Sequence, residues 1–238
     1  MKSALYYIDR AKQRGGRMLS VIDLIERETV SVRQTAWLLK KIEEGSSWLV
    51  GARPGGAGKT AVMAALLAML PENEKIILTE PKSGWGKSSP GTCLLSYEIG
   101  SGNYDAYIWG AELRRFAELG ANGCRLVTNL HADTLEQARS QIVDENGVPE
   151  KHFSAFGIFI PLTVRNGISG VRRTVGKIHF FADGKWMELL ELDAMSAREK
   201  EIAVFLEVLL QDGINTVEQV RKEWQESSSV RTGTGSRL

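Results

Sequence analysis

A chain of 238 residues with 43% hydrophobic and 25% charged residues is long enough for one sizeable soluble domain with small appendages. The formal net charge of +1 does not indicate nucleic acid as a partner. The two cysteines, Cys93 and Cys124, lie far apart without cysteine or histidine neighbours at ligand spacing, which argues against a metal site.

Membrane and export signals are also missing from the sequence. The longest apolar run is well short of the ~20 residues of a membrane span. The N-terminal residues 1–17 are basic, but no long apolar stretch follows them, so they do not form a secretory signal. We expect a cytoplasmic protein, and a peripheral position at the membrane is left open.

The residues before the first expected strand have helical spacing. Apolar residues over 18–44 recur at intervals of three and four, and Ser31 is placed to cap the second part of this stretch. We therefore expect residues 1–44 to form an N-terminal helical segment.

Apolar runs alternate with helical patterns over residues 45–175. Strands are expected over 48–51, 75–79, 105–109, 125–130 and 157–164, with helices over 59–70, 111–119 and 134–143. This alternation predicts an α/β fold with a mainly parallel sheet flanked by helices.

The C-terminal part has a different pattern. Two apolar runs over 177–181 and 186–192 flank an Asp-Gly turn, which predicts a β-hairpin. Ser196 and Glu199 form a capping box before a helix over 196–210, and a shorter helix follows. We expect a hairpin and helical appendage over 176–226, and a disordered tail rich in Ser, Gly, Thr and Arg over 227–238.

The segment RPGGAGKT at residues 53–60 matches the last three positions of the Walker A pattern G-x-x-x-x-G-K-[ST]. Arg53 replaces the first glycine of the pattern, and the extra glycines inside the loop offset that loss of flexibility. Such a loop directs backbone N–H groups and the positive end of a helix at phosphate. The residues predicted to bind the nucleotide are Pro54, Gly55, Gly56, Ala57, Gly58, Lys59, Thr60 and Ala61.

Two of these side chains have specific expected roles, with ATP and Mg²⁺ as the cofactors. Lys59 reaches the β- and γ-phosphates, and the Thr60 hydroxyl is a ligand of Mg²⁺. The alternative is a glycine-rich turn before a helix with a chance Lys-Thr pair. A strand before the loop and a helix after it favour the phosphate loop.

Three further stretches resemble, in order, motifs of the type II/type IV secretion ATPases. This superfamily contains the motors of pilus assembly and retraction, archaeal flagellar assembly and conjugation. Residues 75–81, KIILTEP, resemble its Asp box; residues 105–112, DAYIWGAE, its Walker B motif; residues 125–134, RLVTNLHADT, its His box. The resemblance covers about residues 45–145 and implies a RecA-like P-loop NTPase core over 45–175.

The resemblance implies roles for three side chains that follow strands, where ligands bind in an open α/β sheet. Glu80 would orient the attacking water, Glu112 would support Mg²⁺, and His131 would sense the γ-phosphate. The alternatives are solvated glutamates and a structural histidine. The arginines that could neutralise phosphate charge, with solvated arginine as the alternative, are Arg114, Arg115, Arg172 and Arg173.

The function implied by the resemblance is an ATPase that converts ATP and water to ADP and phosphate. The family implies a homo-oligomer, a hexamer, and secretion or pilus machinery as a partner. The short segment before Arg53 predicts a compact member that lacks the large N-terminal domain, which leaves hexamer assembly open.

Two other functions remain open. In the Asp box Glu80 is followed directly by proline, and in Walker B Ala111 separates the glycine from Glu112. These changes favour a nucleotide-binding regulatory or interaction protein with weak or no hydrolysis. A P-loop kinase acting on a small molecule is disfavoured, because no Arg-rich lid stands out after the Walker B stretch.

Overall fold

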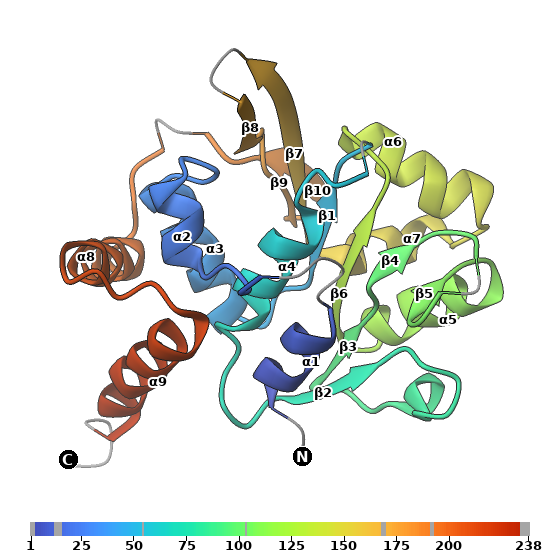
Figure 1. Ribbon diagram of the computed structural model, residues 1–238. Coiled ribbons are helices and arrows are strands. Elements are labelled where there is room, and N and C mark those ends of the chain that lie inside the picture. The colour runs from blue at the N-terminus through green and yellow to red at the C-terminus, as the bar shows by residue number, and fades with distance from the viewer. Residues whose placement is uncertain are drawn as a thin grey trace.

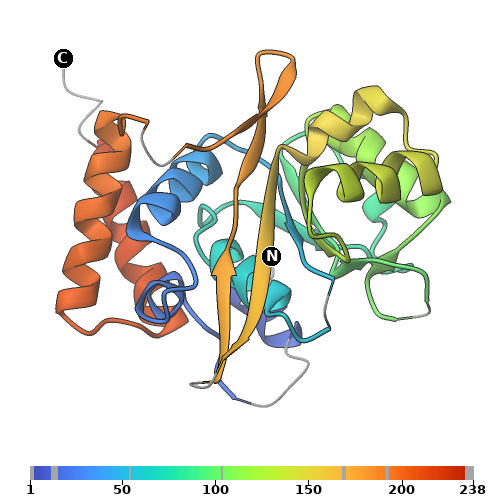
Figure 2. The same ribbon diagram turned by 90° about the horizontal axis from the view of Figure 1, so that it is seen from above.

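The computed structural model describes residues 3–11, 16–53, 55–102, 104–167, 170–190 and 193–233. A mostly parallel sheet lies between two layers of helices (Figure 1), and the view from above shows the same layers (Figure 2). The predicted α/β fold with a mainly parallel sheet flanked by helices is confirmed.

The central strand of the sheet is β1 (Trp48–Gly51), which directly precedes the predicted phosphate loop at residues 53–60. The parallel strands are β1, β2 (Lys75–Leu78), β3 (Thr92–Leu95), β6 (Arg125–Leu130) and β7 (Ile158–Gly167). Their order is β7-β1-β6-β3-β2, and the short strands β4 (Glu98–Ile99) and β5 (Tyr107–Ile108) extend the sheet beside β6. Because these strands are parallel, the segments that follow β1, β4 and β6 meet at one edge of the sheet.

Three antiparallel strands complete the sheet. β8 (Gly170–Val175) forms a hairpin with β7, and β9 (His179–Ala182) with β10 (Lys185–Glu188) forms the predicted C-terminal hairpin beside β7. Asp183 and Gly184 in its turn both have positive φ, 52° and 75°, as a type I′ turn requires.

Side chains alternate between the two helical layers along each central strand. Trp48 and Val50 pack in one apolar cluster with α1 (Ala4–Arg10), α2 (Val21–Glu26), α3 (Val32–Glu43), α4 (Lys59–Leu67), α8 (Ala197–Gln211) and α9 (Val217–Gly233). Leu49, between them, packs in the other cluster with α5 (Ala111–Ala121), α6 (Leu135–Arg139), the π-helical turn Ser140–Glu145 and α7 (Glu150–Phe153). Within the described part of the chain, every helix is too short or too polar to cross a bilayer.

The structure corrects two expectations about secondary structure. Residues 92–95 form the buried strand β3, which was not expected, whereas the strand expected over 105–109 is only the short β5. Helix α9 continues past Ser227, where a disordered tail was expected. The Ser227 and Ser228 hydroxyls donate to the Trp224 carbonyl, so these polar side chains are satisfied within the helix. Residues 234–238 of the expected tail lie outside the described residues.

Candidate functional site

The phosphate loop joins β1 to the N-terminus of α4 at the carboxyl edge of the sheet (Figure 1). Gly56 and Gly58 have φ of 76° and 99°, left-handed conformations that favour glycine, and Gly58 is the N-cap of α4. The first N–H groups of a helix have no partner within the helix and can bind an anion. Pro54, one of the predicted binding residues, lies outside the described residues.

The segment after β6 fixes the start of this loop. The Arg53 N–H donates to Asp133 Oδ1 at 2.8 Å, and His131 Nδ1 lies 2.8 Å from the Arg53 carbonyl oxygen. Because a carbonyl oxygen only accepts hydrogen bonds, we infer that Nδ1 carries a proton. The Arg53 guanidinium extends toward Asp133, with Nε 3.8 Å from Oδ2. The residue that departs from the Walker A pattern is therefore held by the predicted His box.

Lys59, Glu98 and His131 form a charged cluster behind the loop. The Lys59 ammonium donates to the Ala52 carbonyl at 3.2 Å and lies 3.4 Å from Glu98 Oε1. His131 Nε2 is 3.7 Å from the same oxygen. Both Lys59 and Glu98 have side chains only 7% exposed. Glu98 Oε1 forms no hydrogen bond, so its contact with Lys59 is an ion pair without good hydrogen-bond geometry.

Burial raises the pKa of the Glu98 carboxyl above its ordinary value. The nearby charges of Lys59 and His131 lower this pKa, but their combined effect is smaller than that of burial. A carboxyl group in this setting binds a proton more readily than one in water. Its Oε1 is a buried acceptor oxygen that receives no hydrogen bond.

This cluster lines a cavity of about 1280 Å³, larger than the roughly 300–1000 Å³ of typical ligand pockets, so a nucleotide has room in it. The phosphate loop contributes residues 55–62, and the tip of the β7–β8 hairpin contributes residues 170–173. The N-terminal segment forms another wall, with apolar Met18, Leu19 and Leu24 beside polar groups.

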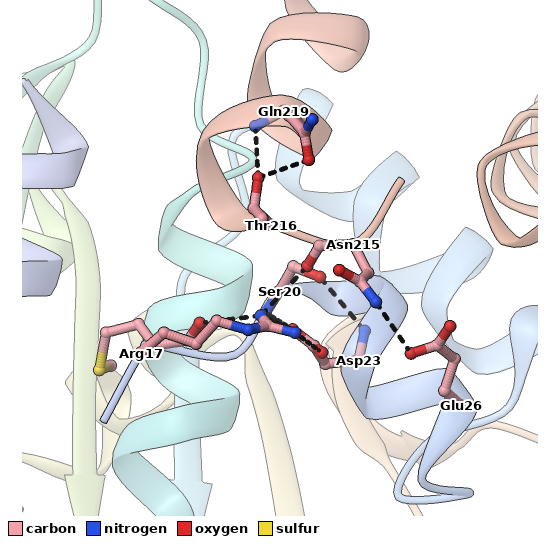
Figure 3. Close-up of polar contacts among 8 residues, drawn as sticks. Arg17, Ser20, Asp23, Glu26, Asn215, Thr216 and Gln219 are labelled. Carbon is pink, nitrogen blue, oxygen red and sulfur yellow. Dashed lines mark hydrogen bonds and ion pairs between the residues drawn. The ribbon is translucent and has the colours of Figure 1, made fainter. Parts of the chain in front are cut away.

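Arg17 holds this N-terminal wall against the C-terminal helices (Figure 3). Its guanidinium donates to both carboxylate oxygens of Asp23, at 2.5 and 2.6 Å, and to the Asn215 carbonyl at 3.3 Å, just before α9. Asp23 also accepts the Ser20 N–H at 2.8 Å in the capping box that begins α2. Burial by itself would raise the pKa of Asp23, but the hydrogen bonds from Arg17 and Ser20 lower it below its usual value.

Replacing Asp23 by alanine should lower the free energy of unfolding by about 1–3 kcal/mol, because Arg17 and the start of α2 lose their acceptor. Glu26→Ala, on the exposed end of the same helix, should cost less than about 0.5 kcal/mol. Urea denaturation at pH 7 and pH 3 measures both.

The effect of Asp23 should depend on pH. Because its pKa is lowered on folding, its contribution is present above the unfolded value of about 3.9 and is lost as the pH falls through the folded value. The difference between wild type and Asp23→Ala should therefore shrink at pH 3. An equal difference at both pH values would contradict this account.

The structure places both predicted carboxylates, Glu80 and Glu112, outside the cavity. Glu80 follows β2 and is ion-paired with Arg10 of α1, at 2.5 Å. Glu112 is exposed in the first turn of α5. Neither lines the cavity, whereas Glu98, which sequence reasoning missed, does. The signal for Glu98 was the apolar run of β3 with a glutamate shortly after it.

Of the four candidate arginines, Arg173 alone contacts the phosphate loop. Arg114 donates to the Asn146 carbonyl at 2.7 Å, and Arg115 to the Gly86 carbonyl. Arg172 is ion-paired with Glu28. Arg173 Nη2 lies 3.4 Å from the Gly56 carbonyl oxygen.

Comparison with known proteins gives similarity at the level of fold. No protein-family model and no curated protein matches the chain. The VirB11 ATPase of the Brucella suis type IV secretion system, in complex with sulphate, is similar with a TM-score of 0.44 and 15% identity, over 79% of this chain and 57% of that one. The Legionella pneumophila ATPase DotB is similar with a TM-score of 0.40 and 12% identity, over 73% and 55%. The chain spans less than two thirds of either protein.

Proposed function

We propose that the protein binds Mg-ATP at the phosphate loop and hydrolyses it to ADP and phosphate. The observation that carries the proposal is the buried pair Lys59 and Glu98, which lines one cavity together with the exposed His131 and the loop. A buried ammonium beside glycine-rich backbone at a helix N-terminus is suited to the charge of a polyphosphate.

The phosphate-binding part of the site is residues 55–61. Their backbone N–H groups and the N-terminus of α4 face the phosphates, and Lys59 exchanges its bond to the Ala52 carbonyl for phosphate oxygens. The apolar wall of Met18, Leu19 and Leu24 on the other side of the cavity is suited to the base and sugar.

The residues present fit Mg²⁺ bound together with the nucleotide. Thr60, half-buried in the first turn of α4, offers its hydroxyl, and Glu98 Oε1 is a buried oxygen without a hydrogen bond that can accept from a metal-bound water. Mg²⁺ in nucleotide sites keeps several waters and takes only one or two protein ligands. When bound, the ion neutralises charge that develops on the transferred phosphoryl group.

Glu98 and His131 act on the attacking water in this proposal. Glu98 accepts a hydrogen bond from the water and orients its oxygen toward the γ-phosphorus. The water oxygen forms a bond to the γ-phosphorus and passes a proton to Glu98, while the bond from that phosphorus to the bridging oxygen breaks and ADP leaves with the electron pair. His131, held by its Nδ1–H on the Arg53 carbonyl, accepts a hydrogen bond from the water at Nε2 when the ring is neutral, and donates from Nε2 to a γ-phosphate oxygen when the ring is charged.

A nucleotide-binding regulatory or interaction protein with weak or no hydrolysis is the second candidate. Glu80 and Glu112 lie outside the cavity, so Glu98 is the one buried carboxylate in the described lining. A single carboxylate, Glu98, must then accept hydrogen bonds both from a water bound to Mg²⁺ and from the attacking water.

Calorimetric titration with Mg-ATP and a phosphate-release assay separate these functions. The proposal predicts saturable binding of one nucleotide per chain and steady release of phosphate. Binding without release would select the regulatory function, and no binding at millimolar Mg-ATP would contradict both.

The same proposal includes assembly of the chain into a ring that acts as the ATPase of a secretion or pilus machine. Sedimentation with and without Mg-ATP tests the ring: a nucleotide-dependent hexamer supports a motor. A monomer under both conditions counts against one.

A further inference from the structure

The β7–β8 hairpin lies over the phosphate loop (Figure 2). β7 is parallel to β1, and Gly51, the last residue of β1, is paired with Pro161. Because β7 continues to Gly167, the hairpin projects beyond the edge of the sheet at which the loop begins. At the base of the hairpin, the Val175 N–H donates to the Thr29 carbonyl at 2.7 Å, which fixes β8 to the N-terminal wall of the cavity.

Arg172 and Arg173 of β8 have different surroundings, as expected for successive residues of a strand. Arg172 is exposed and ion-paired with Glu28. Arg173 is half-buried, opposite Val164 of β7, and forms no ion pair with any described residue. Its guanidinium reaches the Gly56 carbonyl, and its Cδ lies 3.2 Å from the position that a Cβ on Gly58 would occupy.

We propose that Arg173 is a phosphate-binding residue that acts within its own chain, reaching from the hairpin to the terminal phosphates of the nucleotide. This inference rests on the proposed function of the loop. The guanidinium has no acidic partner among the described residues, and its contact with the Gly56 carbonyl is long for a hydrogen bond. It therefore gives up only a weak interaction when it turns to a phosphate. Paired hydrogen bonds from an arginine to a phosphate are short and charge-assisted. They are therefore stronger than the long contact with the Gly56 carbonyl that they would replace.

The contact of Arg173 joins segments that are distant in the sequence. Arg173 is 117 residues from Gly56 in sequence, and its placement depends on the hairpin being held at Val175. A terminal phosphate would therefore connect the loop, the hairpin and the N-terminal wall through one side chain. We expect Arg173 to distinguish nucleotides by the number of phosphates that they carry.

The test compares Arg173→Gln with the matched control Arg165→Gln, an exposed arginine of β7 in the same hairpin that does not line the cavity, and with Arg173→Lys as the conservative variant. Titration with Mg-ATP, Mg-ADP and AMP gives the affinities, and thermal melting shows whether each variant is folded. Arg173→Gln should weaken Mg-ATP binding by about tenfold to a hundredfold, and AMP binding by less than about twofold. Arg173→Lys should recover part of the lost affinity, and Arg165→Gln should bind all three nucleotides like wild type.

The outcomes separate this inference from the proposed function. If wild type binds Mg-ATP and Arg173→Gln binds it as tightly as Arg165→Gln, the role of Arg173 is refuted while the loop's function stands. Equal losses for ATP and AMP would also refute it, because they would indicate a general structural effect. If wild type binds no nucleotide, the proposed function itself fails.

Discussion

Replacing Lys59 by alanine should raise the dissociation constant for Mg-ATP at least about a hundredfold, because the loop loses its one buried positive side chain. The side chain is 7% exposed and has no described carboxylate partner other than Glu98, so the phosphates replace a weak ion pair. Competition with a fluorescent ATP analogue measures the loss. Lys82→Ala, an exposed lysine after β2, is the control and should bind like wild type.

Loss of Lys59 also leaves Glu98 buried without its ammonium partner, so the variant should lose about 1–3 kcal/mol of unfolding free energy as well. The double variant Lys59→Ala/Glu98→Gln removes that uncompensated charge. It should recover stability without recovering binding. A double variant that binds Mg-ATP as tightly as wild type would contradict the role of Lys59.

Glu98→Gln should leave Mg-ATP binding within about fivefold of wild type and slow turnover by about a hundredfold or more, the range for loss of a group that orients or accepts a proton. Glutamine keeps the size of the side chain but cannot act as a carboxylate. Single-turnover phosphate release, with protein in excess over ATP, measures the chemical step apart from binding.

The matched controls for Glu98 are Glu80→Gln and Glu112→Gln, which change the carboxylates of the sequence motifs. Both lie outside the cavity, so their turnover should stay within about twofold of wild type, as expected for surface changes away from a site. Slow turnover by Glu112→Gln with normal turnover by Glu98→Gln would show that the sequence motif, and not the cavity, identifies the working carboxylate.

Turnover should also depend on the protonation of Glu98. Burial raises the pKa of this carboxyl, so the acidic limb of the pH–rate profile should lie above the ordinary glutamate value of 4.5. Rates fall as the pH decreases through this raised pKa, because the protonated group is a weaker acceptor and cannot take a proton from the attacking water.

The local patterns of the sequence predicted the parts of the fold that depend on neighbours in the chain. The phosphate loop could be predicted because its glycines, lysine and threonine lie within six successive residues, 55–60. The Asp-Gly turn and the capping box at Ser196 were visible for the same reason. His131 lies beside the loop because it directly follows the apolar strand β6, which pairs with β1, and its role at the γ-phosphate stays a prediction.

The parts that sequence reasoning missed depend on contacts between distant segments. β3 is a short apolar run without alternation, and its position between β2 and β6 is decided by the sheet. Motif matching therefore assigned the Walker B role to residues 105–112, and Glu98 went unnoticed. Arg173 could be named only as one of four arginines, because no local pattern indicates which arginine reaches the loop.

Amide hydrogen exchange with and without Mg-ATP tests the central claim most directly, because it locates the nucleotide without assuming that turnover occurs. The account predicts slower exchange over residues 55–62 and around His131 in wild type when Mg-ATP is added, and no change in Lys59→Ala. Saturable binding of Mg-ATP without protection of residues 55–62, or with protection elsewhere alone, would contradict it.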